Sequence, residues 1–143
     1  MAAGGITFDA FYPYSELPSQ CDLTKNEYPI TVRDWYYIRD ESAMINHVLT
    51  KGPLAVSLDA SRFEFYKSGI YTDCSTPITI NHAVQIVGVN VEEGYWIIRN
   101  SWGSDWGDNG YMKLALVCVC VVTPACLEAS ALYFTLLYFT LHV

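Results

Sequence analysis

A histidine and an asparagine are the residues of this chain best suited to acid–base chemistry. His82 precedes a β-branched and aromatic run, Ala83 to Val89, and Asn100 follows a second such run, Tyr95 to Arg99. An imidazole changes its charge near neutral pH, so it can take up or release a proton during a reaction. An amide oxygen can accept from one ring nitrogen, which holds one imidazole tautomer and leaves the other nitrogen for proton transfer.

The two runs that flank these residues predict a β-hairpin. They are separated by the polar segment 90–94, which ends in glycine, as hairpin connections commonly do. With a turn centred near Val91 or Glu92, the antiparallel register places His82 opposite Asn100 or a close diagonal neighbour. Such cross-strand positions lie within side-chain reach, and Trp102 follows closely enough to cover the contact.

Two motifs in this region resemble those of a known family. They are Asn-His-Ala-Val at 81–84 and Asn-Ser-Trp-Gly-x-x-Trp-Gly-x-x-Gly-Tyr at 100–111. In this order, a hairpin apart, they resemble the C-terminal half of a papain-like cysteine peptidase of the papain and cathepsin family, over roughly residues 12–114. The resemblance implies an α+β fold: the family's right-hand domain, with an antiparallel, barrel-like sheet and short helices.

The resemblance also implies roles for four residues of the motifs. His82 would be the general base and acid, and Asn100 would orient it. Trp102 would shield their contact, and Trp106 would form the floor of the cleft on the leaving-group side. Without the family, His82 is more often a structural histidine than a catalytic one, and it is the joint order of the motifs that favours catalysis.

Further residues are implied on the substrate side of the cleft. Ala83 would support the site or contact substrate, and Gly5 would offer its backbone to the substrate strand, a flexible terminus being the alternative. The run 54–58 predicts a strand, and with the preceding Gly-Pro it resembles the family strand that contributes to the pocket for the substrate's second residue. Ser57 or Ala55 would face that pocket, unless both simply belong to the core.

The family's nucleophile lies outside the printed sequence. It occurs in Cys-Gly-(Ser or Ala)-Cys-(Trp or Tyr), about 130 to 150 residues before the histidine and asparagine, and none of the 143 residues matches that motif. Cys21 lacks the glycine-rich approach and helix start that promote thiolate formation, and it precedes an aspartate. We therefore expect the helical, cysteine-bearing domain to be missing and the isolated chain to be inactive. The alternative is a non-catalytic domain that binds peptides or a partner, or a vestigial fragment.

The remaining cysteines suggest a disulfide rather than a metal site. The resemblance implies that Cys74 pairs with a cysteine near the C-terminus, Cys126 and Cys120 being the candidates. The spacing Cys118-x-Cys120 is too tight for a usual zinc pair, and no histidine lies near it. No cofactor is therefore expected.

The C-terminal segment 116–143 departs from the family. We expect residues 1–115 to form the papain-like part and 116–143 an atypical apolar tail whose single charge is Glu128. A membrane span needs about 20 mainly apolar residues, and here it would have to include Pro124 and Glu128, so membrane association is not expected.

One amphipathic helix is predicted over Ser42–Lys51, ended by a Gly-Pro pair. Its apolar stripe would comprise Ile45, Val48 and Leu49. His47 lies off that stripe, so a solvated histidine is expected.

Charge and location complete the expectations. With 8 basic and 15 acidic residues the net charge is −7, which argues against a nucleic-acid partner because phosphate contacts need clustered cations. The partners implied by the resemblance are a peptide or protein substrate and the missing N-terminal half. The implied location is lysosomal or extracellular, although residues 1–5 show no signal-peptide pattern.

Overall fold

The computed structural model describes residues 8, 10–13, 36–74 and 79–118. The chain divides into two compact units, Met1–Tyr36 with Tyr138–Val143, and Tyr37–Leu137. In the first unit the described residues form a turn, in which the Phe8 carbonyl accepts from two following backbone N–H groups. All the assigned helices and strands lie in the second unit.

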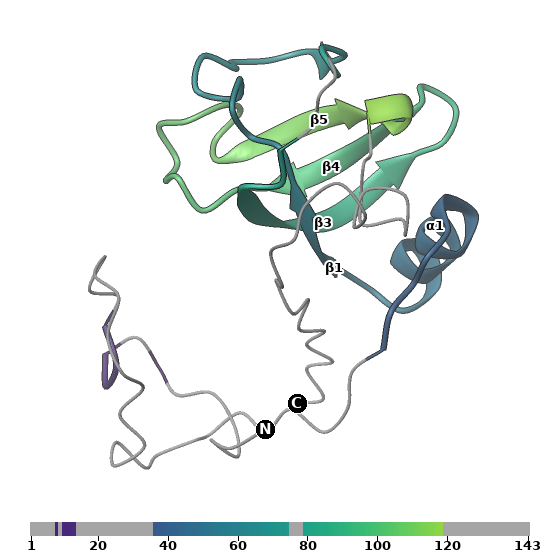
Figure 1. The fold of residues 1–143 in the computed structure, drawn as a ribbon, viewed down its shortest axis with the longest axis horizontal. Coiled ribbons are helices and arrows are strands. Elements are labelled where there is room, and N and C mark those ends of the chain that lie inside the picture. Colours follow the sequence, from purple (N-terminus) through teal and green to yellow (C-terminus); the bar gives the residue numbers. More distant parts are fainter. Residues whose placement is uncertain (1–7, 9, 14–35, 75–78, 119–143) are drawn as a thin grey trace. The chain divides into compact units, whose positions relative to one another are not determined.

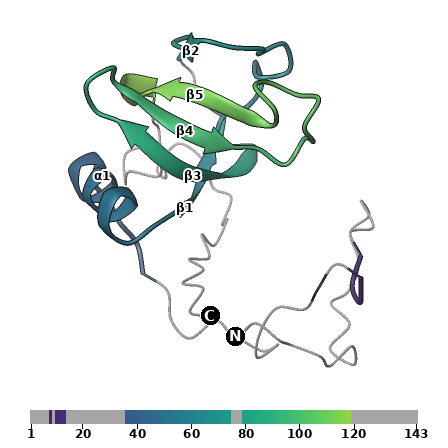
Figure 2. The same cartoon turned by 180° about the vertical axis from the view of Figure 1, so that it is seen from behind.

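Five strands form one sheet in the order β1-β3-β4-β5-β2 (Figure 1). The bounds are β1 Leu54–Leu58, β2 Ile70–Tyr71, β3 His82–Asn90, β4 Tyr95–Arg99 and β5 Tyr111–Ala115. The pairs β1/β3, β3/β4 and β4/β5 are antiparallel, whereas β2 runs parallel to β5. The view from behind shows the same succession of strands (Figure 2).

The α+β prediction is confirmed, but the sheet is neither purely antiparallel nor closed. The strands β1 and β2 lie at opposite edges of the described sheet. Closure would require these edges to pair, and β2 has only 2 residues with which to do so. The described part of the chain therefore has an open, mixed sheet with one α-helix rather than a barrel-like sheet with several.

The predicted hairpin is formed by β3 and β4. Its register pairs Asn90 with Tyr95 and Gln85 with Arg99, with an irregularity between Ile86 and Gly88. Continued past β4, this register places Asn100 near the start of β3. The hairpin thus brings His82 of the first motif close to Asn100 of the second.

One face of the sheet forms the hydrophobic core. Trp96 and Ile86 are fully buried, and Ile98, Met112 and Leu54 are nearly so. Burial of such side chains is the main favourable term in folding. The core therefore lies under the central strands β3, β4 and β5, which also deliver the motif residues.

The helix α1, Glu41–Thr50, packs against β3. Asp40 caps its N-terminus, because its side chain accepts from the Ala43 N–H at 2.7 Å. The buried residues are Met44 and His47, whereas Leu49 is 63% exposed. The predicted stripe and the predicted solvated histidine are therefore wrong: the buried face follows Met44, and a residue three positions on lies on the same face.

A disulfide joins Cys74 to Cys118. Neither Cys126 nor Cys120 is the partner, so the expected pairing is wrong. The reason lies in the sheet: β2 pairs with β5 in the register Tyr71 with Leu114. The cysteines follow shortly after these two residues, and Cys118 ends the 3-10 helix η1, Leu116–Cys118.

Some expectations fall outside the described residues. These are the conformation of Gly5, Cys21, Cys120 and Cys126, and that of the apolar tail beyond Cys118. Within the described ranges, no helix is long and apolar enough to cross a bilayer.

Candidate functional site

The site is built around the contact between His82, at the start of β3, and Asn100, just after β4. The His82 Nε2 atom lies 2.8 Å from the Asn100 Oδ1 atom. The Ser101 backbone N–H also donates to this oxygen, at 2.8 Å. Because a backbone N–H can only donate, the orientation of the Asn100 amide is fixed, and His82 must carry its proton on Nε2. The Nδ1 atom is then the basic nitrogen of the neutral ring.

Two tryptophans cover this contact. The Trp102 ring centroid lies 4.9 Å from that of His82, with the planes inclined by 32°. Trp106 meets Trp102 edge to face, with centroids 5.3 Å apart. Trp102 is 41% exposed and Trp106 only 8%, so one indole forms the outer cover and the other supports it from within.

Trp106 is anchored by residues that sequence reasoning did not select. Its Nε1–H donates to the Phe63 carbonyl at 3.0 Å, and the Tyr66 ring lies 5.7 Å away. The only sequence signal for such a contact is general: a buried indole N–H usually finds an acceptor. That rule does not say which carbonyl will accept.

Glycines explain the spacing of the second motif. Gly107 has φ 60°, and a Cβ there would lie 2.5 Å from the Tyr111 carbonyl oxygen. A side chain is thus excluded both by conformation and by space. Gly110 has φ 89°, and its carbonyl accepts from the Asn100 N–H at 2.9 Å. The loop that carries both tryptophans therefore closes back onto Asn100.

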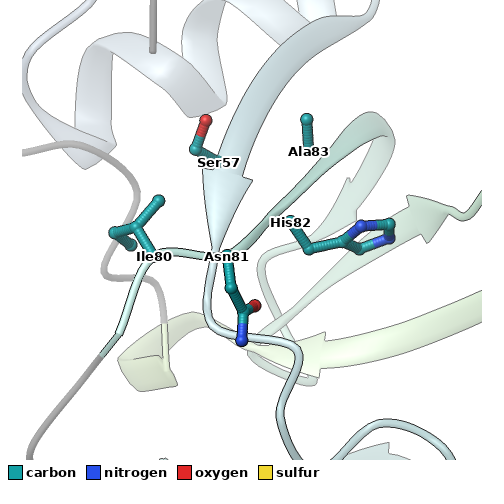
Figure 3. Close-up of a pocket in the computed structure, with 5 residues that line it drawn as sticks. All are labelled: Ser57, Ile80, Asn81, His82 and Ala83. Atoms are coloured by element: carbon teal, nitrogen blue, oxygen red, sulfur yellow. The ribbon is translucent and has the colours of Figure 1, made fainter. Parts of the chain in front are cut away.

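A small open pocket adjoins His82 (Figure 3). Ser57 comes from β1, Ile80 and Asn81 directly precede β3, and His82 and Ala83 are the first two residues of β3. Of the two pocket candidates on β1, Ser57 lines this pocket and Ala55 does not. The lining residues are Ser57, Ile80, Asn81, His82 and Ala83. Ile80 and Asn81 were not selected from the sequence, although both directly precede His82.

Two further observations concern the described residues. The Asn100 Nδ2 atom is buried and has no hydrogen-bond partner among them. No group of three side chains there is placed to bind a metal ion. The arrangement is suited to proton transfer at His82.

A family model described as "Papain family cysteine protease" matches residues 1–127. Among curated proteins, cathepsin S of Mus musculus is 41% identical over 118 residues, which cover 78% of this chain and 35% of that protein. The chain thus spans about a third of the length of this relative.

Two solved structures are similar in fold. Bromelain from Ananas comosus, in complex with the E64 inhibitor, aligns with a TM-score of 0.64 and 33% identity, over 80% of this chain and 55% of bromelain. Procathepsin L2 from the larval midgut of Tenebrio molitor aligns with a TM-score of 0.66 and 37% identity, over 78% of this chain and 38% of the other.

Proposed function

This chain belongs to the papain family of cysteine proteases, and we propose that it supplies the histidine and asparagine for thiol-dependent hydrolysis of peptide bonds. The observation that carries the proposal is the 2.8 Å contact between His82 Nε2 and Asn100 Oδ1. Peptide or protein substrates follow from the family. The nucleophilic thiol would come from a cysteine-bearing half whose motif the printed sequence does not contain.

In this proposal His82 acts through Nδ1. It takes the proton of the thiol, and the resulting imidazolium stabilises the thiolate. The sulfur attacks the peptide carbonyl carbon, and the imidazolium gives its proton to the leaving amine. His82 then takes a proton from water, whose oxygen attacks the thioester, and the acid is released as the thiolate leaves. Asn100 orients the ring throughout without adding a negative charge.

The neighbouring residues would shape the cleft around this reaction. Trp102 excludes water from the hydrogen bond between His82 and Asn100, and Trp106 forms the floor on the leaving-group side. The pocket beside Ser57 and Ala83 receives a substrate side chain. Gly5 would add a backbone contact to the substrate strand.

Location and domain limits follow from the same relationship. A lysosomal or extracellular site of action is proposed, together with a partner half that carries the cysteine. Residues 1–115 would form the C-terminal part of a papain-like peptidase domain, which carries the histidine and asparagine, followed by the atypical apolar segment 116–143.

A second candidate function is binding without catalysis. It is favoured by the small open pocket that adjoins His82. In this case the pocket beside His82 would hold a peptide or partner chain that is never cleaved.

Fusion of a cysteine-bearing half from a papain-family relative upstream of Met1 tests both candidates. We expect hydrolysis of a fluorogenic peptide that is blocked by thiol alkylation. His82→Ala should reduce the rate by a factor on the order of 10² to 10⁴, the usual contribution of an acid–base group. As a matched control, Asp105→Ala removes an exposed side chain outside the proposed machinery and should leave the rate unchanged. Hydrolysis that survives His82→Ala contradicts the first candidate, and peptide binding without turnover supports the second.

A further inference from the structure

Hydrogen bonds join two short segments that lie next to His82, one after β1 and one before β3. The Asp59 Oδ1 atom accepts from the Ser61 N–H at 2.9 Å, and Oδ2 accepts from the Thr79 N–H at 2.8 Å. The Asn81 side chain accepts from the Ala60 N–H at 2.9 Å and donates to the Ser61 Oγ at 2.8 Å. We call these four bonds the polar clamp; three of them join residues 59–61 to residues 79–81, and the bond from Ser61 to Asp59 lies within the first segment.

The polar clamp controls how the chain runs into β3. Asn81 donates its backbone N–H to the Leu58 carbonyl at 3.2 Å, and Leu58 pairs with His82 in the sheet. The backbone of His82 is therefore fixed from one side by β1 and from the preceding side by residues 79–81. Two of these preceding residues, Ile80 and Asn81, also line the pocket with His82 (Figure 3).

We propose that Asp59 is a positioning residue for His82: its carboxylate bridges the two segments and so keeps the imidazole Nε2 on Asn100. A carboxylate accepts at both oxygens, which the two N–H groups require. An asparagine would present one acceptor and one donor, and the donor would face one of these N–H groups. The catalytic meaning of this positioning rests on the proposed function, whereas the clamp itself does not.

Asp59 stays ionised in mildly acidic solution, so its carboxylate can accept both hydrogen bonds there. Burial raises the pKa of Asp59, but hydrogen bonds from Ser61 and Thr79 and the charge of Arg62 outweigh it, so the pKa lies below the usual 3.8. Tyr71 in β2 also lies within electrostatic range of the carboxylate. The clamp is therefore complete above pH 3.8 and is lost as the pH falls through the lowered pKa.

Nuclear magnetic resonance on the full chain tests the clamp without any substitution. An amide proton that donates to a carboxylate changes its chemical shift when that carboxylate is protonated. We expect the amides of Ser61 and Thr79 and the Nε2–H of His82 to shift with one shared midpoint below pH 3.8. Separate midpoints for the two amides, or a His82 signal that ignores the shared midpoint, would overturn the proposal.

A variant tests whether Asp59 acts on the imidazole. In Asp59→Asn at neutral pH, the ¹⁵N shifts of His82 should change from a single Nε2-protonated form to a mixture with the Nδ1-protonated form. Asp73→Asn is the control, since it removes a charge from an exposed carboxylate and should leave the single form. A folded Asp59→Asn chain that keeps the single form contradicts a positioning role. If this variant does not fold, the shared midpoint in the unsubstituted chain still decides.

These readouts separate the two proposals. Neither requires turnover, so intact resonance signatures in a fusion protein that does not hydrolyse peptides would refute the proposed function and leave the clamp. Hydrolysis of peptides by the fusion protein, together with different midpoints for the Ser61, Thr79 and His82 signals, would support the proposed function and refute the positioning role of Asp59.

Discussion

The contact between the His82 and Asn100 side chains is fixed because one oxygen atom of Asn100 accepts two hydrogen bonds. Its Oδ1 atom accepts from both His82 and Ser101, so neither the amide nor the ring can turn without breaking a bond. The pair could be predicted from the sequence because both members lie in recognisable motifs at a hairpin's spacing. Asp59 and the Phe63 carbonyl could not, since they act through bonds with the backbone, which leave no pattern of residue types at a fixed spacing.

At the residue scale, Trp106→Phe tests the buried support of the site. The change removes the bond from Nε1 to the Phe63 carbonyl, and that oxygen keeps the Tyr66 backbone N–H as a donor. We expect a loss of about 0.5 to 1.5 kcal/mol in the free energy of unfolding, the usual net contribution of one hydrogen bond. Denaturant titration measures it.

The matched control is Trp102→Phe. Trp102 is 41% exposed, and surface substitutions usually change stability by about 0.5 kcal/mol or less. Equal losses for the two variants would show that Trp106 does not support the site through its indole N–H.

At the scale of elements, the hairpin and the helix show what periodicity can and cannot predict. The strands of the hairpin have β-branched and aromatic runs separated by a glycine-ended turn. The sequence therefore predicts both strands at nearly their observed bounds. The sequence also predicts the helix, but it does not predict which face of the helix is buried. Ten residues offer several stripes at helical spacing, and the contact with β3 selects the one that contains Met44. That choice depends on tertiary packing rather than on the helix sequence.

The burial of His47 predicts a pH dependence of stability. Burial, and then the charge of Lys51, lower the pKa of His47 below 6.5. Between this lowered value and 6.5 the unfolded chain binds more protons than the folded one, so stability falls as the pH falls through that window. Unfolding free energies measured from pH 8 to pH 5 should show this loss.

His47→Gln provides the control, because glutamine does not titrate. Its stability should depend less on pH over the same interval. A slope identical to that of the unsubstituted chain would mean that other groups cause the dependence.

At the scale of the whole molecule, the open sheet is held at one edge by a covalent bond. The strand β2 has 2 residues, too few to hold an edge by backbone hydrogen bonds alone, and the disulfide lies just beyond its pairing with β5. The sequence indicated that Cys74 would be bridged. It could not identify Cys118, because the choice depends on the parallel register of β2 and β5.

Removal of this disulfide tests its contribution. The cysteines are 44 residues apart, and the chain-entropy relation for a loop of that size gives a stabilisation of about 4 kcal/mol. The double variant Cys74→Ser with Cys118→Ser should lose about this amount in denaturant titrations. Reduction of the unsubstituted chain should reproduce the loss, and equal unfolding midpoints before and after reduction would contradict it.

The order of the strands also has a consequence for how the chain folds. The strands β3, β4 and β5 follow one another both in the sequence and in the sheet, so their contacts close short loops. Local contacts form faster than distant ones because less loop-closure entropy is lost. The contact between His82 and Asn100 belongs to this local group. The strands β1 and β2, in contrast, pair with strands that lie farther away in the sequence. The contact between His82 and Asn100 can therefore form early, and the pairing of the edge strands and the bond between Cys74 and Cys118 then hold it in place.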